Sequence, residues 1–333
     1  MPYPRSRFGL AIVANLLFCL IGDAAEPATP AGEVVRLTFA GDIMLDTLPG
    51  EYIAAGKDPF ADFAKIFAAA DASIGNLECV VATTGEKLDK KYTFRAHPRT
   101  LPFLRKHFAA LSLANNHSGD YGHVAFLEQL DLLRAHQIGY FGGGKNTVEA
   151  RTPLVLERKG LKIAILGYNE FKPRYFEAGP SWPGLAWSVD EQVTADIRAA
   201  RTIHKADLVI PFMHWGWEHE TGPDARQRQL AHMMIDAGAD VVVGGHPHVT
   251  QGAEYYRGKL IVYSLGNFVF DGFDLPEQKR GWLLRLTLDR QGLVAWETLA
   301  AQMDDEGTPH PLPGESTPCG KRGETAVRLC ANP

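Results

Sequence analysis

The 333-residue sequence is poor in cysteine and contains only Cys19, Cys79, Cys319 and Cys330. A soft thiolate metal site needs several cysteines close together, so the sequence disfavours that kind of site. Cys319 and Cys330 flank a short polar segment and could pair in an oxidising compartment, where the bond would contribute roughly 2–3 kcal/mol against unfolding. The apolar neighbours of Cys79 are more typical of a buried free thiol than of a nucleophile.

Basic residues are not in excess either. The formal net charge is −5 at pH 7, and lysines and arginines form no long run. Proteins that bind nucleic acid usually carry a basic patch or stripe, so we expect no nucleic-acid partner. An anionic polymer could bind only at a local basic patch.

A hydrophobic run long enough to cross a membrane is also missing. The run at residues 8–22 is shorter than the about 20 residues that a membrane helix needs. It follows Arg5 and Arg7 and precedes small residues and prolines, which is the layout of a signal peptide. We therefore predict that residues 1–25 are a signal peptide and that the protein is exported to the periplasm or the cell exterior. Retention of this segment as a membrane anchor is the weaker alternative.

The rest of the chain alternates apolar runs of strand length with helical patterns. The predicted strands are residues 35–41, 72–77, 109–115, 161–168, 206–215, 239–245, 260–270 and 281–289. The predicted helices are residues 58–70, 122–137, 189–205 and 224–238. This alternation predicts an α/β fold whose central strands are buried.

Polar residues that can bind metal or transfer protons lie at or just after the ends of most of these strands. They are Asp42, Asn76, Glu78, Asn115, Asn116, His117, His214, His246 and His248. Sites in open α/β sheets gather at the carboxyl ends of strands, so residues far apart in sequence can converge there. Imidazole, carboxylate and amide groups together suit Zn²⁺, Mn²⁺, Fe²⁺ or Mg²⁺. The pattern therefore predicts a shared divalent metal site.

The stretch "GGHPHVTQG" at 244–252 is the most distinctive of these motifs. Residues at i and i+2 on an extended chain point to the same side, so we expect His246 and His248 to face one metal cluster, with Pro247 stiffening the segment. Taken singly, the motif also fits a solvated turn, and His214 also fits a core histidine. Asp42 and Asn116 also fit turn or helix-cap positions. The joint pattern favours the metal site.

Six motifs in order extend this hypothesis: "FAGDIML", "GNLE", "LANNHSGDYG", "HWGWE", "GGHPHVTQG" and "YSLGNFVFD". From about Leu37 to Asp271 they resemble the CapA family, bacterial poly-γ-glutamate capsule synthesis proteins related to calcineurin-like metallophosphoesterases. The resemblance implies a four-layer α/β/β/α sandwich, which we assign to residues 33–300, followed by a C-terminal tail at 301–333. It also implies work on an envelope polymer, in capsule assembly or release.

The resemblance also implies roles for single residues. Asp42 and His248 resemble ligands of a first metal, and Glu78 resembles a bridging carboxylate, with Asn76 as the alternative. Asn116, His214 and His246 resemble ligands of a second metal, and His117 resembles the catalytic histidine. Met44 stands where the wider phosphoesterase pattern has a histidine, so one firmly held ion with a weaker neighbour is an equal alternative to two tight ions.

Further residues complete the predicted site. His117 would protonate a leaving group, and Asp120 would orient it or, equally, cap the next turn. Arg95, in the basic stretch 87–98, has a planar guanidinium that could bind a carboxylate of an anionic polymer such as poly-γ-glutamate. The equal alternative is that this stretch is a solvated charged loop. Asn76, Glu218 and Asn267 would shape the pocket or support the ligands.

Two functions remain open. The first is a metal-dependent enzyme that cleaves or transfers an amide or phosphoester bond in such a polymer. The second is a non-catalytic component of a capsule assembly or export complex, working with capsule synthesis membrane proteins. The four histidines favour the enzyme, and Met44 favours the assembly role.

Overall fold

In the computed structural model, which describes residues 1–4 and 33–333, strands alternate with helices as the sequence predicts. The predicted signal peptide lies outside the described residues, apart from its first four. Within the described ranges, no helix is both long enough and apolar enough to span a membrane. Residues 33–333 form one unit.

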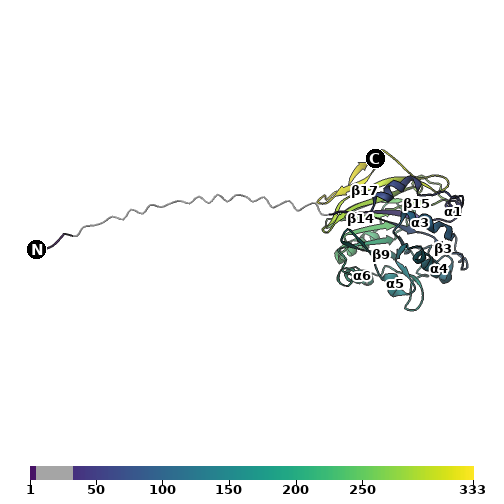
Figure 1. Ribbon diagram of the computed structural model, residues 1–333, viewed down its shortest axis with the longest axis horizontal. Helices are drawn as coiled ribbons and strands as arrows, with labels where there is room; N and C mark the ends of the chain where they lie inside the picture. The colour runs from purple at the N-terminus through teal and green to yellow at the C-terminus, as the bar shows by residue number, and fades with distance from the viewer. Residues whose placement is uncertain (5–32) are drawn as a thin grey trace. The chain divides into compact units, whose positions relative to one another are not determined.

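Two large sheets organise this unit (Figure 1). The ten-stranded sheet has the order β20 (Arg328–Ala331), β19 (Ser316–Lys321), β17 (Gly292–Met303), β16 (Arg280–Asp289), β1 (Val35–Ile43), β2 (Ala72–Leu77), β5 (Ala110–Ser112) and β6 (Gly139–Phe141), with β15 (Asn267–Val269) beside β1 and β18 (Pro309–Pro311) beside β17. The six-stranded sheet has the order β13 (Thr250–Tyr256), β14 (Lys259–Leu265), β12 (Val241–Gly245), β11 (Leu208–His214), β9 (Leu161–Asn169) and β8 (Leu154–Arg158). Two small pairs join β3 (Val80–Val81) to β4 (Arg95–Ala96) and β7 (Gly143–Gly144) to β10 (Gly184–Leu185).

Three apolar layers show that the fold is the predicted α/β/β/α sandwich. The middle layer joins the two sheets, as where Phe39 of β1 meets Phe212 of β11 with ring centroids 5.9 Å apart. The outer layer of the ten-stranded sheet packs against α1 (Thr47–Ala54), α2 (Ala64–Ala69), α3 (Leu101–His107) and α4 (Gly122–Ala135). The outer layer of the six-stranded sheet packs against α5 (Thr147–Arg151), α6 (Asp190–Thr202) and α7 (Ala225–Ala237). Short 3-10 turns occupy Ala61–Phe63 and Pro98–Thr100.

Parallel pairing brings the strand ends together. Strands β9, β11, β12 and β14 run parallel in one sheet, and β1, β2, β5 and β6 run parallel in the other. Nearly all residues of these central strands are buried, which explains their continuous apolar sequences. Their carboxyl ends therefore lie at one edge of each sheet.

The predicted single strand at 260–270 is wrong. The structure divides it into β14, in the six-stranded sheet, and β15, in the ten-stranded sheet. Gly266 lies between them with φ of +67°, a backbone region that a residue with a Cβ enters at a cost. This turn carries the chain from one sheet to the other and places Asn267 opposite Asp42.

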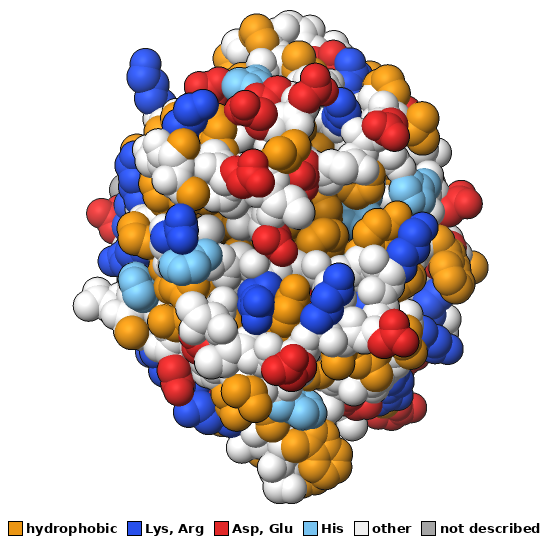
Figure 2. Space-filling view, turned by 90° about the vertical axis from the view of Figure 1, so that its right-hand side faces the viewer, with side chains coloured by type: hydrophobic (Ala, Val, Ile, Leu, Met, Phe, Trp, Pro, Cys, Tyr) orange, Lys and Arg blue, Asp and Glu red, His pale blue; other side chains and the backbone are white. Residues whose placement is uncertain are grey.

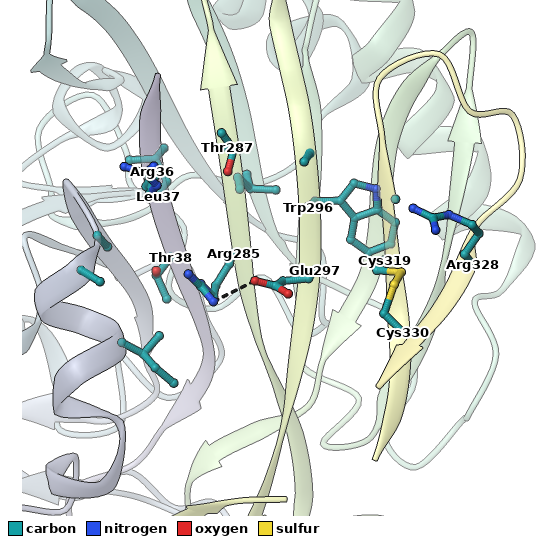
Figure 3. Close-up of a pocket in the computed structure, with 16 residues that line it drawn as sticks. Arg36, Leu37, Thr38, Arg285, Thr287, Trp296, Glu297, Cys319, Arg328 and Cys330 are labelled. Carbon is teal, nitrogen blue, oxygen red and sulfur yellow. Dashed lines mark ion pairs between the residues drawn. A yellow bond between two sulfur atoms is a disulfide. The ribbon is translucent and has the colours of Figure 1, made fainter. Parts of the chain in front are cut away.

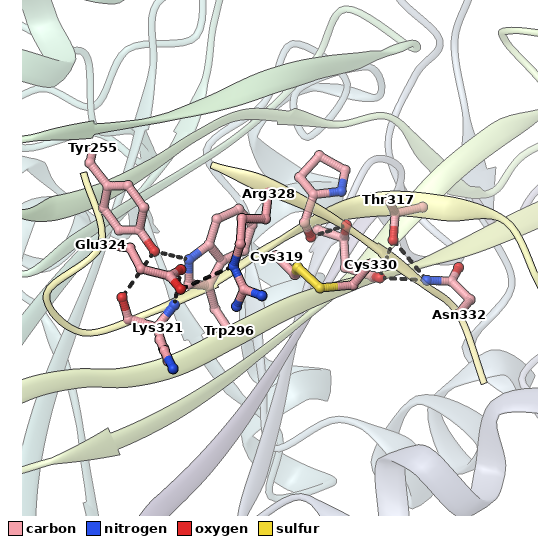
Figure 4. Close-up of a disulfide and its surroundings, with 11 residues drawn as sticks. Tyr255, Trp296, Thr317, Cys319, Lys321, Glu324, Arg328, Cys330 and Asn332 are labelled. Atoms are coloured by element: carbon pink, nitrogen blue, oxygen red, sulfur yellow. Dashed lines mark hydrogen bonds and ion pairs between the residues drawn. A yellow bond between two sulfur atoms is a disulfide. The ribbon is translucent and has the colours of Figure 1, made fainter. Parts of the chain in front are cut away.

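The C-terminal segment continues the ten-stranded sheet. The boundary drawn at residue 300 falls inside β17, and β18, β19 and β20 pair beyond it. A disulfide joins Cys319 to Cys330 across the last two strands, with Cα atoms 5.9 Å apart (Figure 4). Beside it, Trp296 Nε1 donates to the Tyr255 hydroxyl at 2.7 Å and so ties this edge to β13 of the other sheet. Cys79 is a buried free thiol.

Candidate metal centre

The predicted polar residues converge where the carboxyl ends of the two sheets meet. In the ten-stranded sheet, Asp42 lies in register with Asn76, which donates to it at 2.8 Å. In the other sheet, His214 lies in register with Gly245. A Cβ on Gly245 would lie only 2.9 Å from Asp42 Oδ1, so glycine allows the sheets to approach here. Figure 2 views the end of the molecule that carries α1, where acidic, basic and histidine side chains are interspersed.

The first group of donors is Glu78, His214 and His246, all buried. Around His214 Nε2 lie Glu78 Oε1 at 3.6 Å and His246 Nδ1 at 3.0 Å. Asn116 adds its Oδ1 at 2.6 Å from the same nitrogen. Four side chains from four separate segments of the chain thus present donor atoms to one point.

The second group is Asp42, Glu78 and His248, also buried. Glu78 Oε1 lies 3.7 Å from His248 Nε2, and Asp42 Oδ2 lies 3.4 Å from His248 Nδ1. Asn267 Oδ1 accepts from His248 Nδ1 at 2.8 Å, which leaves the Nε2 lone pair for a metal. Glu78 belongs to both groups, so its carboxylate lies between them.

The donor set fits divalent ions. Two buried atoms of the cluster, Glu78 Oε1 and His246 Nε2, have no hydrogen-bond partner among the described residues. Such atoms are costly unless something binds them. Ligands held at 2.0–2.2 Å around a tetrahedral ion lie about 3.3–3.6 Å apart, close to the separations seen here. Histidine nitrogen with carboxylate and amide oxygen suits a borderline or hard cation.

The protonation states agree with this chemistry. Burial lowers the pKa of His214 and of His246 well below the usual value, so both rings are neutral with free lone pairs. Burial, reinforced by the nearby Asp42 charge, raises the pKa of Glu78 well above its usual value. Burial opposes ionisation of Asp42 as well, but the hydrogen bonds of His248 and Asn76 hold the pKa of Asp42 low. A cation in the cluster would stabilise the ionised forms of Asp42 and Glu78.

The backbone of the His-Pro-His segment is not extended, so that part of the sequence reasoning is wrong. His246 has φ of +99° and His248 has φ of +57°, values that cost a non-glycine residue of the order of 1–3 kcal/mol. Both side chains nevertheless reach the cluster, with ring centroids 5.9 Å apart. Strained backbone kept at two donors is typical of a functional site.

A histidine–aspartate pair lies beside the donors. His117 Nδ1 is 2.7 Å from Asp120 Oδ2, and both side chains are buried. Lys90 Nζ bonds the other oxygen of Asp120 at 2.7 Å and the carbonyl of Asn116 at 2.8 Å. Burial lowers the pKa of His117 despite the aspartate, so the ring is neutral. With Nδ1–H donated to Asp120, the lone pair of His117 is on Nε2.

Comparison with known proteins assigns the chain to a family. The profile of the family described as "Bacterial capsule synthesis protein PGA_cap" matches residues 36–272. The "PGA biosynthesis protein CapA" of Bacillus subtilis is 31% identical over 328 residues, covering 92% of this chain and 82% of that protein. The chain belongs to the PGA_cap family. The "Capsule biosynthesis protein CapA" of Bacillus anthracis is also 31% identical, covering 84% of this chain and 70% of its own.

Among solved structures, the NAD nucleotidase of Haemophilus influenzae aligns with 85% of this PGA_cap chain and 61% of its own, at 12% identity and a TM-score of 0.47. A likeness at that level says nothing about function.

One predicted site residue, Arg95, has its contacts away from the cluster, and so has Met44. Nη1 of Arg95 donates to the carbonyls of Thr84 and Gly85 at 3.3 and 3.4 Å, and the guanidinium lies over the Tyr121 ring. Met44 is fully buried in the core, and its sulfur accepts from the backbone N–H of Asp46. Neither contact set reaches the donors.

Lys90 and Tyr175 are the residues that the sequence reasoning missed. Tyr175 donates its hydroxyl to the Asn116 carbonyl at 3.1 Å and lies within 3.3 Å of Lys90 Nζ. Lys90 lies in the basic stretch 87–98, but on sequence alone the planar guanidinium of Arg95 fits a carboxylate of the polymer better. Nothing in the sequence marks Tyr175.

A groove lies on the outer face of the ten-stranded sheet, away from the strand ends (Figure 3). This groove, of about 240 Å³, is bounded by α2 and the β19–β20 hairpin and lined by Arg36, Thr38, Arg285, Glu297, Cys319 and Arg328, among others. None of the His/Asp/Glu/Cys groups that could hold a metal in the described chain lies there. The candidate metal centre therefore lies at the strand ends and not in this groove.

Proposed function

We propose that this protein is an exported, metal-dependent enzyme that acts in capsule or poly-γ-glutamate synthesis or release, by hydrolysis or transfer at an amide or phosphoester bond. The observation that carries the proposal is the placement of Glu78 between two groups of buried donors, with the neutral His117 beside them. A purely structural ion would need neither an adjacent histidine–aspartate pair nor unsatisfied donors.

The relatives support the substrate class. Those aligned above are a PGA biosynthesis protein and a capsule biosynthesis protein, and they match most of this chain. An anionic envelope polymer such as poly-γ-glutamate is the substrate we infer, and capsule synthesis membrane proteins are the partners we infer.

Two groups of residues in the site would each hold one divalent ion. Asp42, Glu78 and His248 would hold one divalent ion; the second would be held by Glu78, Asn116, His214 and His246. When bound, such ions supply Lewis-acid polarisation of a carbonyl or phosphoryl oxygen and make water more acidic.

His117 moves the proton. Because the ring is neutral, it would accept a proton at Nε2 from the attacking water or acceptor group and then donate this proton to the leaving group. Asp120 holds the ring tautomer and balances the imidazolium charge, and Lys90 anchors Asp120 and the Asn116 backbone.

One observation favours the assembly role as a second candidate. The buried Met44 accepts at its sulfur from the Asp46 N–H, so this segment offers the cluster the Asp42 carboxylate and no imidazole. Metal analysis of the mature protein, followed by turnover of a γ-linked glutamate polymer and of a generic phosphodiester with Mn²⁺ or Zn²⁺ restored, separates the two. Bound metal without turnover of either substrate supports the assembly component.

Export rests on the sequence at residues 1–25 alone. Amino-terminal sequencing of the protein from the cell envelope tests it. We expect a new terminus near Ala25 or Glu26, and an intact Met1 would contradict cleavage.

A further inference from the structure

The two donor groups are unequal in number. Glu78, His214, His246 and Asn116 provide four donors to one point, whereas Asp42, Glu78 and His248 provide three to the other. A four-coordinate ion at the second point lacks a protein ligand. One more carboxylate lies next to His248 of this group, and next to His246.

Glu218 is that carboxylate. One of its oxygens forms a compact group with one nitrogen each of His246 and His248, every pair of atoms lying within 4.8 Å. Unlike the other donors it is exposed, with 43% of its side chain accessible. Within residues 33–333 its carboxylate accepts no hydrogen bond, and its ion-pair contact, His219, is 3.9 Å away.

The loop that carries Glu218 is fixed against the histidine segment. The backbone N–H of His219 donates to the Pro247 carbonyl at 2.8 Å, between the two site histidines. On the far side, Gln251 donates to the Glu220 carbonyl at 2.8 Å. Before Glu218, the buried Trp215 donates to the Tyr263 carbonyl at 2.8 Å. These bonds fix the backbone while the Glu218 side chain remains free to turn toward the cluster.

Charge balance points the same way. Two divalent ions bring four positive charges into a buried site where Asp42 and Glu78 supply two negative ones. Uncompensated charge in such surroundings is costly. Each additional carboxylate ligand removes one excess charge.

We propose that Glu218 is a metal ligand on the solvent side, completing the donor set of Asp42, Glu78 and His248. This rests on the metal centre of the proposed function. Because Glu218 is the exposed member, its position is also where an anionic group of a substrate would reach the ion, by displacing the Glu218 carboxylate.

Mn²⁺ titration of the metal-free, full-length mature protein, followed by electron paramagnetic resonance and calorimetry, tests the assignment. In Glu218→Gln we expect the weaker Mn²⁺ site to lose about 10–100-fold in affinity and the tighter site to stay within twofold. The matched control is Glu220→Gln, which removes an exposed acid two residues away on the same loop and should leave both affinities unchanged.

Repeating the Mn²⁺ titration at high salt distinguishes direct ligation by Glu218 from a long-range electrostatic effect of its charge. At about 1 M salt the Debye length is about 3 Å, so a long-range charge effect of Glu218 would vanish whereas a ligand bond would not. The assignment is overturned if both affinities in Glu218→Gln match wild type, if both fall equally, or if the loss disappears in high salt. If wild type itself binds no Mn²⁺, the proposed metal centre falls, which is a different result.

Discussion

The strand-end cluster and the sheet-face groove both bring charged side chains together, yet they differ in how their charges are satisfied. In the groove, Arg285 is paired with Glu297 at 2.8 Å, and Arg328 is paired with Glu324 at 3.0 Å (Figures 3 and 4). In the cluster, Glu78 and His246 keep buried atoms without partners. The cluster also contains two histidines at positive φ. Unmet bonding and local strain, more than open volume, mark the place where a ligand completes the structure.

Glu78→Gln should show this contrast most strongly. The variant loses the carboxylate shared by both donor groups, so we expect neither ion to remain bound after dialysis. It also removes a carboxyl that burial and Asp42 make costly to ionise, so the metal-free variant should unfold at the same temperature as metal-free wild type or a few degrees higher. Elemental analysis and calorimetry measure the two effects.

Arg285→Ala in the groove is the control and should keep full metal content. A Glu78→Gln protein that retains metal, or that unfolds well below metal-free wild type, would mean that Glu78 serves the fold and not an ion.

His117→Ala should separate proton transfer from metal binding. We expect a loss of roughly 10²–10⁴-fold in rate on whatever substrate is turned over, with metal content within twofold of wild type, because the ring contacts Asp120 and not the donors. His123→Ala, which removes an exposed histidine of α4, should leave both unchanged. Loss of metal in His117→Ala would make His117 a ligand.

Most of the fold could be predicted because its central strands are buried on both faces. The eight predicted strands and four predicted helices all contain observed elements. β17 was missed because polar and apolar residues follow no simple period along it. β19 and β20 were missed because short strands at a sheet edge depend on pairing and on the disulfide more than on their own sequences.

The site could be predicted where a residue lies at or just after the end of a strong strand. Asp42, Glu78, His214, His246 and His248 all do, and they meet in the structure. Lys90 and Tyr175 come from loops, where sequence periodicity carries no information about which side chain turns inward. The guanidinium of Arg95 suits a carboxylate chemically, but the sequence does not show that its Nη1 bonds two carbonyls and that it lies over the Tyr121 ring.

The disulfide beside the groove should matter to stability and not to the cluster. Cys319 and Cys330 are 11 residues apart, so the bond restricts a short loop of the unfolded chain and contributes about 3 kcal/mol. Cys319→Ser and wild type in reductant should unfold at the same, lower temperature, with metal content unchanged. Equal unfolding temperatures in oxidised wild type and Cys319→Ser would contradict a stabilising role.

The smallest effect we expect is at the Arg285–Glu297 pair. These residues lie directly opposite each other on β16 and β17, and their side chains are 36% and 42% exposed. Water screens such a pair and the two long side chains lose entropy when they are held together, so the coupling between them should be about 0.2–1 kcal/mol. A double-mutant cycle of Arg285→Ala and Glu297→Ala by urea unfolding measures it, and high salt should reduce it. A coupling above about 2 kcal/mol would show that the pair is effectively desolvated, as buried charges are. A fall in metal content in either variant would show that the groove and the metal centre are energetically coupled. No contact between the described residues suggests such a coupling.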